Sequence, residues 1–314
     1  MLFIWIIVFI VSLFFLLKGA DWLIISAEKI GFSLGLSPFI IGITIVAVGT
    51  SLPELVSSLV ATLEGFTDIV VANAIGSNIA NILLIGGISA VLSRKIMVTK
   101  NLINFDLIVL AVSTLFLLGI IWDKQVTLIE AIILIAIYII YILFSIFHKD
   151  TIEEKRGEDE ENLIPKIQTR DFFILIVGIV SLVFGAKYLI EALVNLSIIF
   201  KIGTGLIAIT AVAVGTSLPE LIVSVKAIFQ KKSEVALGNI FGSNIFNALI
   251  VVGLPGLFRN LSVDDQTFSV GIPALILATF LFIISGVSKK IYLWGGIIYL
   301  FIYAVFMAKL FNLF

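Results

Sequence analysis

The chain has 314 residues, of which 61% are hydrophobic and only 13% charged, and its mean hydropathy is +1.23. This composition excludes an ordinary soluble domain and indicates a multi-pass protein whose solvent is the lipid bilayer of the cell membrane. A net charge of −1 excludes a basic surface for nucleic acid, and the absence of Cys excludes thiolate metal sites and cysteine nucleophiles.

Apolar segments long enough to cross about 30 Å of hydrocarbon follow one another along the chain. Five of them fall near residues 2–27, 37–63, 69–92, 103–121 and 127–147, and five more near 171–199, 204–229, 234–258, 267–287 and 291–311. The sequence therefore predicts an all-α polytopic membrane protein with ten transmembrane helices. It divides into a first half (1–147), a charged linker (148–170) and a second half (171–314).

A polar motif inside the second span recurs in the second half of the chain. The sequence Gly-Thr-Ser-Leu-Pro-Glu at 49–54 is repeated letter for letter at 215–220, an offset of 166 residues. The same offset carries Gly-Ser-Asn-Ile at 76–79 onto 242–245. The chain is thus a duplication, and because each half has an odd number of spans, the two repeats are expected to be inverted in the membrane.

The distribution of basic residues predicts the orientation. With the N-terminus outside, most Lys and Arg residues fall in the loops assigned to the cytoplasm, including the linker. The loops and tail on the other side hold only Lys124, Lys201, Arg259 and Lys309. We therefore expect both termini outside and the linker 148–170 in the cytoplasm.

Each copy of the motif combines a helix-breaking Pro with oxygen-bearing side chains. Pro53 lacks an amide hydrogen, so its helix should kink or break and free backbone carbonyls. Thr50 and Glu54 share one helix face, and the next span carries polar residues at intervals of four. These polar residues are Asn73, Ser77 and Asn81, and the second half repeats the set as Thr216, Glu220, Asn239, Ser243 and Asn247.

The available ligands are carboxylate, amide, hydroxyl and carbonyl oxygens, which suit hard cations such as calcium and sodium. Two Glu residues facing each other would carry a charge near −2 and should not both stay ionised without a cation. Ser, Thr and Asn also hydrogen-bond between helices for structural reasons, but the matched copies favour a cation site. The charges of the first spans, Lys18 with Asp21 and Lys187 with Glu191, are interpreted as snorkelling or pairing along their helices.

The two motifs, together with the Asn-containing segments 73–81 and 238–247, resemble the alpha repeats of the calcium/cation antiporter superfamily, specifically its prokaryotic sodium/calcium exchanger branch. The resemblance covers essentially the whole chain and implies two inverted repeats of five helices. It implies that Glu54 and Glu220 bind calcium, assisted by the carbonyls of Thr50 and Thr216. It also implies that sodium uses these residues together with Ala47, Ser51, Ser77, Ala213, Ser217 and Ser243, while Asn81 and Asn247 complete the central site.

The implied function is sodium/calcium antiport by alternating access, in which the first spans of the two halves shift against the rest. No cofactor is expected, and the chain is expected to act as a monomer. A calcium/proton exchanger and a passive cation channel remain alternatives, whereas an intramembrane enzyme is not expected. Several relatives, including the potassium-dependent exchangers, have Asp where this chain has Asn247, which puts a role for potassium in doubt.

Overall fold

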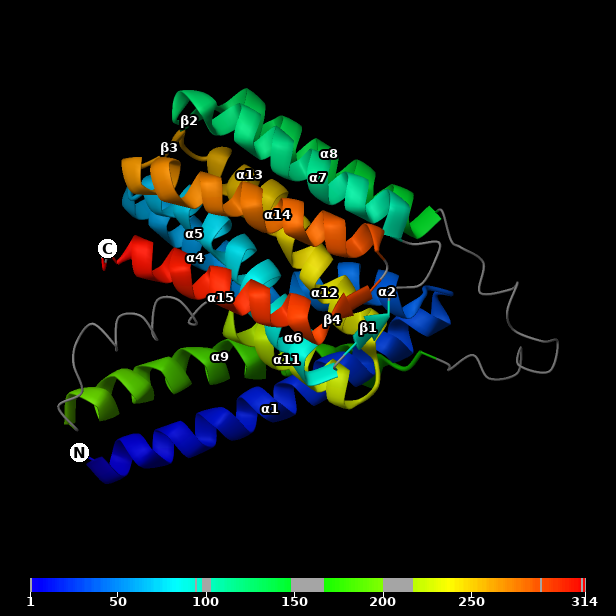
Figure 1. Cartoon of the computed structure of the whole chain (residues 1–314). Helices are drawn as coiled ribbons and strands as arrows, with labels where there is room; N and C mark the ends of the chain where they lie inside the picture. Colours follow the sequence, from blue (N-terminus) through cyan, green and yellow to red (C-terminus); the bar gives the residue numbers. More distant parts are fainter. Residues whose placement is uncertain are drawn as a thin grey trace.

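A computed structural model describes residues 2–93, 95–97, 103–147, 167–199, 217–288, 290–311 and 313, which form a bundle of long helices (Figure 1). The first half contains α1 (Leu2–Ser33), α2 (Pro38–Ile41), the π-helical turn η1 (Gly42–Val46), α3 (Ala47–Thr50), α4 (Leu52–Glu64), α5 (Asp68–Ile79), the π-helical turn η2 (Ala80–Ile85), α6 (Gly86–Ser93), β1 (Lys95–Met97), α7 (Ile103–Ile120), the 3-10 turn η3 (Ile121–Asp123), β2 (Gln125–Val126) and α8 (Leu128–Phe147). The second half contains α9 (Thr169–Ile199), α11 (Leu218–Phe229), α12 (Ser233–Phe246), the π-helical turn η6 (Asn247–Val251), α13 (Val252–Gly256), β3 (Leu261–Ser262), the π-helical turn η7 (Thr267–Gly271), α14 (Ile272–Val287), β4 (Lys290–Tyr292) and α15 (Leu293–Leu310).

Within the described residues, eight helical segments are long and apolar enough to cross a membrane, and one bent pair of helices adds a ninth. These nine match nine of the ten predicted spans in order. Of the remaining predicted span, 204–229, only the part from Ser217 onward is described, and it forms α11. Helix α9 begins at Thr169, inside the segment assigned to the linker, while linker residues 148–166 lie outside the described part of the chain.

The bent pair is the predicted second span, which is broken in its middle. Helical structure runs from Pro38 to Thr50, and α4 then starts at Leu52 with its axis bent by 42°. Pro53 is the second residue of α4, a position where a helix tolerates a residue without an amide hydrogen. In an unbroken helix the amide of residue 53 would donate to the Gly49 carbonyl, and Pro53 cannot form this hydrogen bond. The break predicted from Pro53 is therefore confirmed.

Two short antiparallel strand pairs lie at opposite ends of the helices (Figure 1). At one end Ile96 of β1 pairs with Ile291 of β4, and at the other Val126 of β2 pairs with Leu261 of β3. Helix α7 lies between β1 and β2 in the chain, so the two pairs are separated by the length of this helix, about 27 Å. Each pair joins a loop of the first half to a loop of the second.

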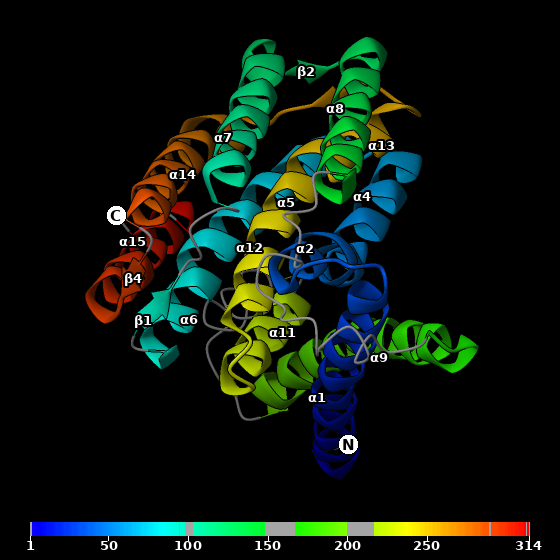
Figure 2. The same ribbon diagram turned by 90° about the vertical axis from the view of Figure 1, so that its right-hand side faces the viewer.

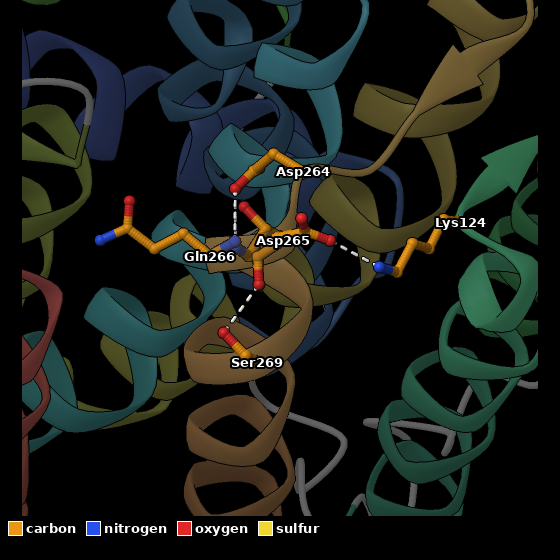
Figure 3. Close-up of polar contacts among 6 residues, drawn as sticks. Lys124, Asp264, Asp265, Gln266 and Ser269 are labelled. Carbon is orange, nitrogen blue, oxygen red and sulfur yellow. Dashed lines mark hydrogen bonds and ion pairs between the residues drawn. The ribbon is translucent and has the colours of Figure 1, made fainter.

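The end that carries β2 and β3 is held together by charged side chains (Figure 3). Lys124 Nζ lies 2.6 Å from Asp265 Oδ1, and this hydrogen bond lowers the pKa of Asp265 below its ordinary value. Asp264 Oδ1 accepts hydrogen bonds from the amides of Gln266 and Thr267 at 2.9 and 2.8 Å, which caps the helical turn that leads into η7. These contacts fix the loop that precedes α14.

Helix α12 occupies the middle of the molecule, with α7 and α8 at one edge and α1 and α9 at the other (Figure 2). It is buried along nearly its whole length and packs backbone to backbone on the Pro38–Thr50 segment. A Cβ on Gly42 would lie 2.6 Å from the Val235 carbonyl oxygen and 2.8 Å from Gly238 Cα. Larger residues at these positions would push the helices apart, so glycine brings the two halves into direct contact.

Helices α1 and α9 form a pair along one edge of the molecule (Figure 1). A Cβ on Gly19 would lie 2.9 Å from the Gly178 carbonyl oxygen, and one on Gly185 would lie 2.8 Å from the Leu16 amide nitrogen. Their close packing joins the two helices into one unit.

The charges on this pair correct one prediction. Asp21 does not pair along its own helix, because its carboxylate lies 2.6 Å from Lys226 Nζ of α11. Lys187 lies over the ring of the adjacent Tyr188, with its Nζ 5.6 Å from the ring centroid. Helix α1 is therefore linked by charge to α11, whereas the Lys187 contact stays within α9.

Candidate cation-binding site

In both copies of the motif a helix begins directly after the serine. Ser51 has φ −88° and ψ 7°, and its counterpart Ser217 has φ −85° and ψ 10°, so the residue before the helix has nearly the same backbone conformation in each copy. Glu54 and Glu220 then lie in the first turns of α4 and α11. Because the N-terminal end of a helix carries partial positive charge, this position favours a carboxylate.

Hydrogen bonds connect the two copies across the contact between the halves. Ser51 Oγ donates to Glu220 Oε1 at 2.8 Å, and Thr50 Oγ1 donates to Asn239 Oδ1 at 3.0 Å. Glu54 and Glu220 are 0% and 1% exposed. The two copies therefore meet in the interior, and Ser51 of the first copy donates a hydrogen bond to the carboxylate of the second.

Each carboxylate-bearing helix is fixed by an Asn of the following span. Asn73 Nδ2 donates to the Glu54 backbone oxygen at 3.2 Å and to a serine hydroxyl of α4 at 3.1 Å. Asn239 Nδ2 donates to the Glu220 backbone oxygen at 3.4 Å and to the corresponding serine of α11 at 3.0 Å. The contacts match residue for residue under the offset of 166, so they hold the two acids in equivalent places.

Several predicted ligands carry buried polar atoms that lack a partner. Asn81 and Asn247 are 1% and 0% exposed, and neither the oxygen nor the nitrogen of either amide has a hydrogen-bond partner among the described residues. Glu220 Oε2 and Ser243 Oγ also lack a hydrogen-bond partner among the described residues. Unpartnered buried polar atoms are costly, so this arrangement fits a bound ligand that supplies the missing interaction.

The remaining predicted ligands have different surroundings. Ser77 and Ser217 are buried, at 4% and 3% exposure. The Ala47 carbonyl accepts hydrogen bonds from the Ser51 amide at 3.0 Å and from Thr50 Oγ1 at 3.2 Å, so it is already engaged. Ala213 and Thr216 lie outside the described residues.

Two features of the site were missed by the sequence analysis. Asn81 and Asn247 belong to the π-helical turns η2 and η6, which occupy equivalent positions in the two halves, and such turns are frequent at functional sites. The π-turn that begins with Asn247 packs against α4, and the π-turn that contains Asn81 packs against α11, so each turn contacts the acid-bearing helix of the other half. In addition, Asn78 Nδ2 donates to the backbone oxygen of its own counterpart Asn244 at 3.0 Å. The repeated Gly-Ser-Asn-Ile motif was the available signal for this contact.

A cavity of about 1060 Å³ lies between α4, α5, α9 and α15. Asp264 and Gln266 line it at the end of the molecule that carries β2 and β3, and Asn73, Ser77 and Ser217 line its polar part. The cavity thus connects one end of the helix bundle with residues of the candidate site.

These features define a class of protein: a polytopic helical membrane protein with a cluster of buried oxygen-bearing side chains. The family model described as sodium/calcium exchanger protein matches residues 4–147 and 171–312. The chain therefore belongs to the sodium/calcium exchanger family.

Relatives and solved structures agree with this assignment. The chain is 32% identical to the sodium/calcium exchanger MaX1 of Methanosarcina acetivorans, covering 97% of each chain. It is 32% identical to the inner membrane protein YrbG of Escherichia coli, over 87% of this chain and 86% of that protein. A solved structure of the sodium–calcium exchanger NCX_Mj, soaked without sodium and calcium, superposes with a TM-score of 0.81 at 30% identity, covering 99% of this chain and 100% of that one.

Proposed function

We propose that the chain exchanges sodium for calcium across the cell membrane by alternating access, with both ions bound between the two halves. The observation that carries this proposal is the pair of buried acids in the first turns of matched helices, one of which accepts a hydrogen bond from the other copy of the motif. The relatives named as sodium/calcium exchangers support the choice of ions.

Glu54 and Glu220 would together supply a charge near −2, which one calcium ion or several sodium ions can compensate. The proposed calcium ligands are these two carboxylates with Thr50 and Thr216. The proposed sodium ligands add Ala47, Ala213, Ser51, Ser217, Ser77 and Ser243, and Asn81 and Asn247 complete the centre. Because the same carboxylates serve both ions, sodium and calcium compete, and this competition couples their transport.

The proposed architecture is ten helices in two inverted repeats. The strand pairs support it: β1 corresponds to β3 under the offset of 166, yet β1 lies at the opposite end of α7 from the β2–β3 pair. Repeats related without inversion would place these counterparts at the same end. We assign the β2–β3 end and both termini to the outside and the linker to the cytoplasm, and one chain suffices because it contains both acids.

Removing either acid should abolish exchange. In proteoliposomes loaded with sodium, calcium uptake after removal of external sodium should fall more than about 100-fold in Glu54→Gln and in Glu220→Gln, because an unpaired buried charge costs about 3–5 kcal/mol. Glu191→Gln, the same chemical change at an exposed position of α9, should leave uptake near the wild-type level. Uptake that does not depend on the sodium gradient would indicate a passive channel, and near-normal exchange in both variants would make the acids structural.

Topology can be tested with single cysteines in this Cys-free chain. Gln125→Cys in β2 and Asn260→Cys beside β3 should react with an impermeant thiol reagent from outside. Ser288→Cys, beside β4, and Asp159→Cys in the linker should react only from the cytoplasmic side. Reaction of Asn260→Cys and Ser288→Cys from the same side would contradict the proposed arrangement.

Asn247 supplies an oxygen without a charge, so the site has no third carboxylate with which to compensate potassium carried with calcium. Sodium-driven calcium flux in vesicles should therefore be equal with potassium present or replaced by choline. Asn247→Asp should increase competition by protons, seen as flux that falls more steeply at low pH, because neighbouring carboxylates favour protonation. Loss of wild-type flux without potassium would show that Asn247 does not confer potassium independence.

A further inference from the structure

Helix α1 is tied to the corner between α11 and α12 by ionic contacts. Lys226 Nζ lies 2.6 Å from Asp21 Oδ2, and Gln230 Nε2 donates to Asp21 Oδ1 at 3.2 Å, so both oxygens of this carboxylate are engaged. Lys232 Nζ lies 2.6 Å from Glu28 Oε2. The four charged side chains are only 14–28% exposed, so solvent and salt screen these pairs less than pairs on an open surface.

The duplication creates a second corner of the same kind, between α4 and α5, facing α9. Gly19-Ala20 in α1 corresponds to Gly185-Ala186 in α9, and the α11–α12 corner corresponds to the α4–α5 corner. The backbone confirms this correspondence, because Lys231 has φ 61° at one corner and Gly65 has φ 96° at the other. Both corners therefore turn through the left-handed region at the same residue of the repeat.

The two corners differ in the ion pairs that their side chains form. Under the offset of 166, Lys187 takes the place of Asp21 and Glu64 takes the place of Gln230, so the second corner also brings together two groups that attract. Both side chains are exposed, and neither forms an ion pair with any described residue. Lys187 instead lines the cavity, which lies between α9 and α4 on this side of the molecule.

We propose that the two corners are alternating latches. The contacts of Asp21 and Glu28 hold the α1–α9 pair in the arrangement seen here, with the cavity present beside α9. When the pair shifts and the cavity closes, these contacts break and Lys187 pairs with Glu64. The proposal rests on the inverted repeats and alternating access proposed above, because inversion makes each half in one state equivalent to the other half in the opposite state.

Asp21, Glu28, Lys226 and Lys232 are positioning residues in this scheme. None is a proposed ion ligand, but Lys226 lies on α11, whose first turn carries Glu220. The α1–α9 pair is itself joined by the Lys29–Asp171 contact at 2.7 Å, which lies within the moving unit and need not break.

The test is a cross-link that reports the state not seen here. Purified full-length protein carrying Glu64→Cys and Lys187→Cys is treated with a short bifunctional thiol reagent, and the rate of intramolecular cross-linking is measured. Adding Asp21→Asn should raise that rate roughly two- to fivefold, the range expected for one partly exposed ion pair. The charge exchange Asp21→Lys with Lys226→Asp should return it to the starting value, which a merely structural role would not do.

Asp265→Asn is the matched control, because it breaks a pair of the same 2.6 Å length that does not involve α1 or α9 (Figure 3). It should leave the rate unchanged. If Asp21→Asn does not fold, Lys226→Gln takes its place, because it removes the same ion pair from the α11 side. No cross-link in any background, equal rates in Asp21→Asn and Asp265→Asn, or a rise that the charge exchange does not reverse would each overturn the proposal. Cross-linking is measured without transport, so the two proposals can fail separately. If sodium-driven calcium uptake is normal but the cross-linking rate does not respond to Asp21→Asn, the latch alone is refuted. If the rate responds as expected but the protein shows no sodium-driven calcium uptake, the proposed function alone is refuted.

Discussion

Burial of Glu54 and Glu220 in the apolar interior carries a free-energy cost that only a cation, a proton or hydrogen bonds can offset. The position and the hydrogen bonds of the two acids offset part of this cost. Each acid sits at the first turn of a helix, where the helix dipole favours it, and Glu220 accepts a hydrogen bond from Ser51. Among the described residues the amides of Asn81 and Asn247 have no hydrogen-bond partner, and their oxygens are of the kind that bind hard cations.

The duplication explains how one chain brings two short polar motifs into contact in its interior. Equivalent Asn residues, 73 and 239, hold equivalent acids, and glycines at the contact of α12 with the Pro38–Thr50 segment let the two halves meet backbone to backbone. The polar interior is therefore nearly symmetric. The charges at its ends are not: Asp21 binds Lys226 at one corner, while Lys187 and Glu64 form no ion pair with the described residues at the other.

Much of this could be predicted from the sequence because the strongest signals are local. Long apolar runs located nine spans, and the missing amide of Pro53 located the helix break. The sequence could not show which side chains meet across the halves. The Ser51–Glu220 bond and the pairing of Asp21 with Lys226 join residues far apart in the chain, and the second of these replaced a predicted local pairing. The π-helical turns at Asn81 and Asn247 also escaped prediction, because a one-residue change of helical register leaves no compositional trace.

The central claim is that the two acids form one site and not two. Equilibrium calcium binding to the purified protein in sodium-free buffer tests this most directly. One calcium ion should bind per chain, and binding should be lost in Glu54→Gln and equally in Glu220→Gln. Two ions per chain in the wild type, with one retained in each single variant, would contradict the account, because each half would then bind calcium on its own.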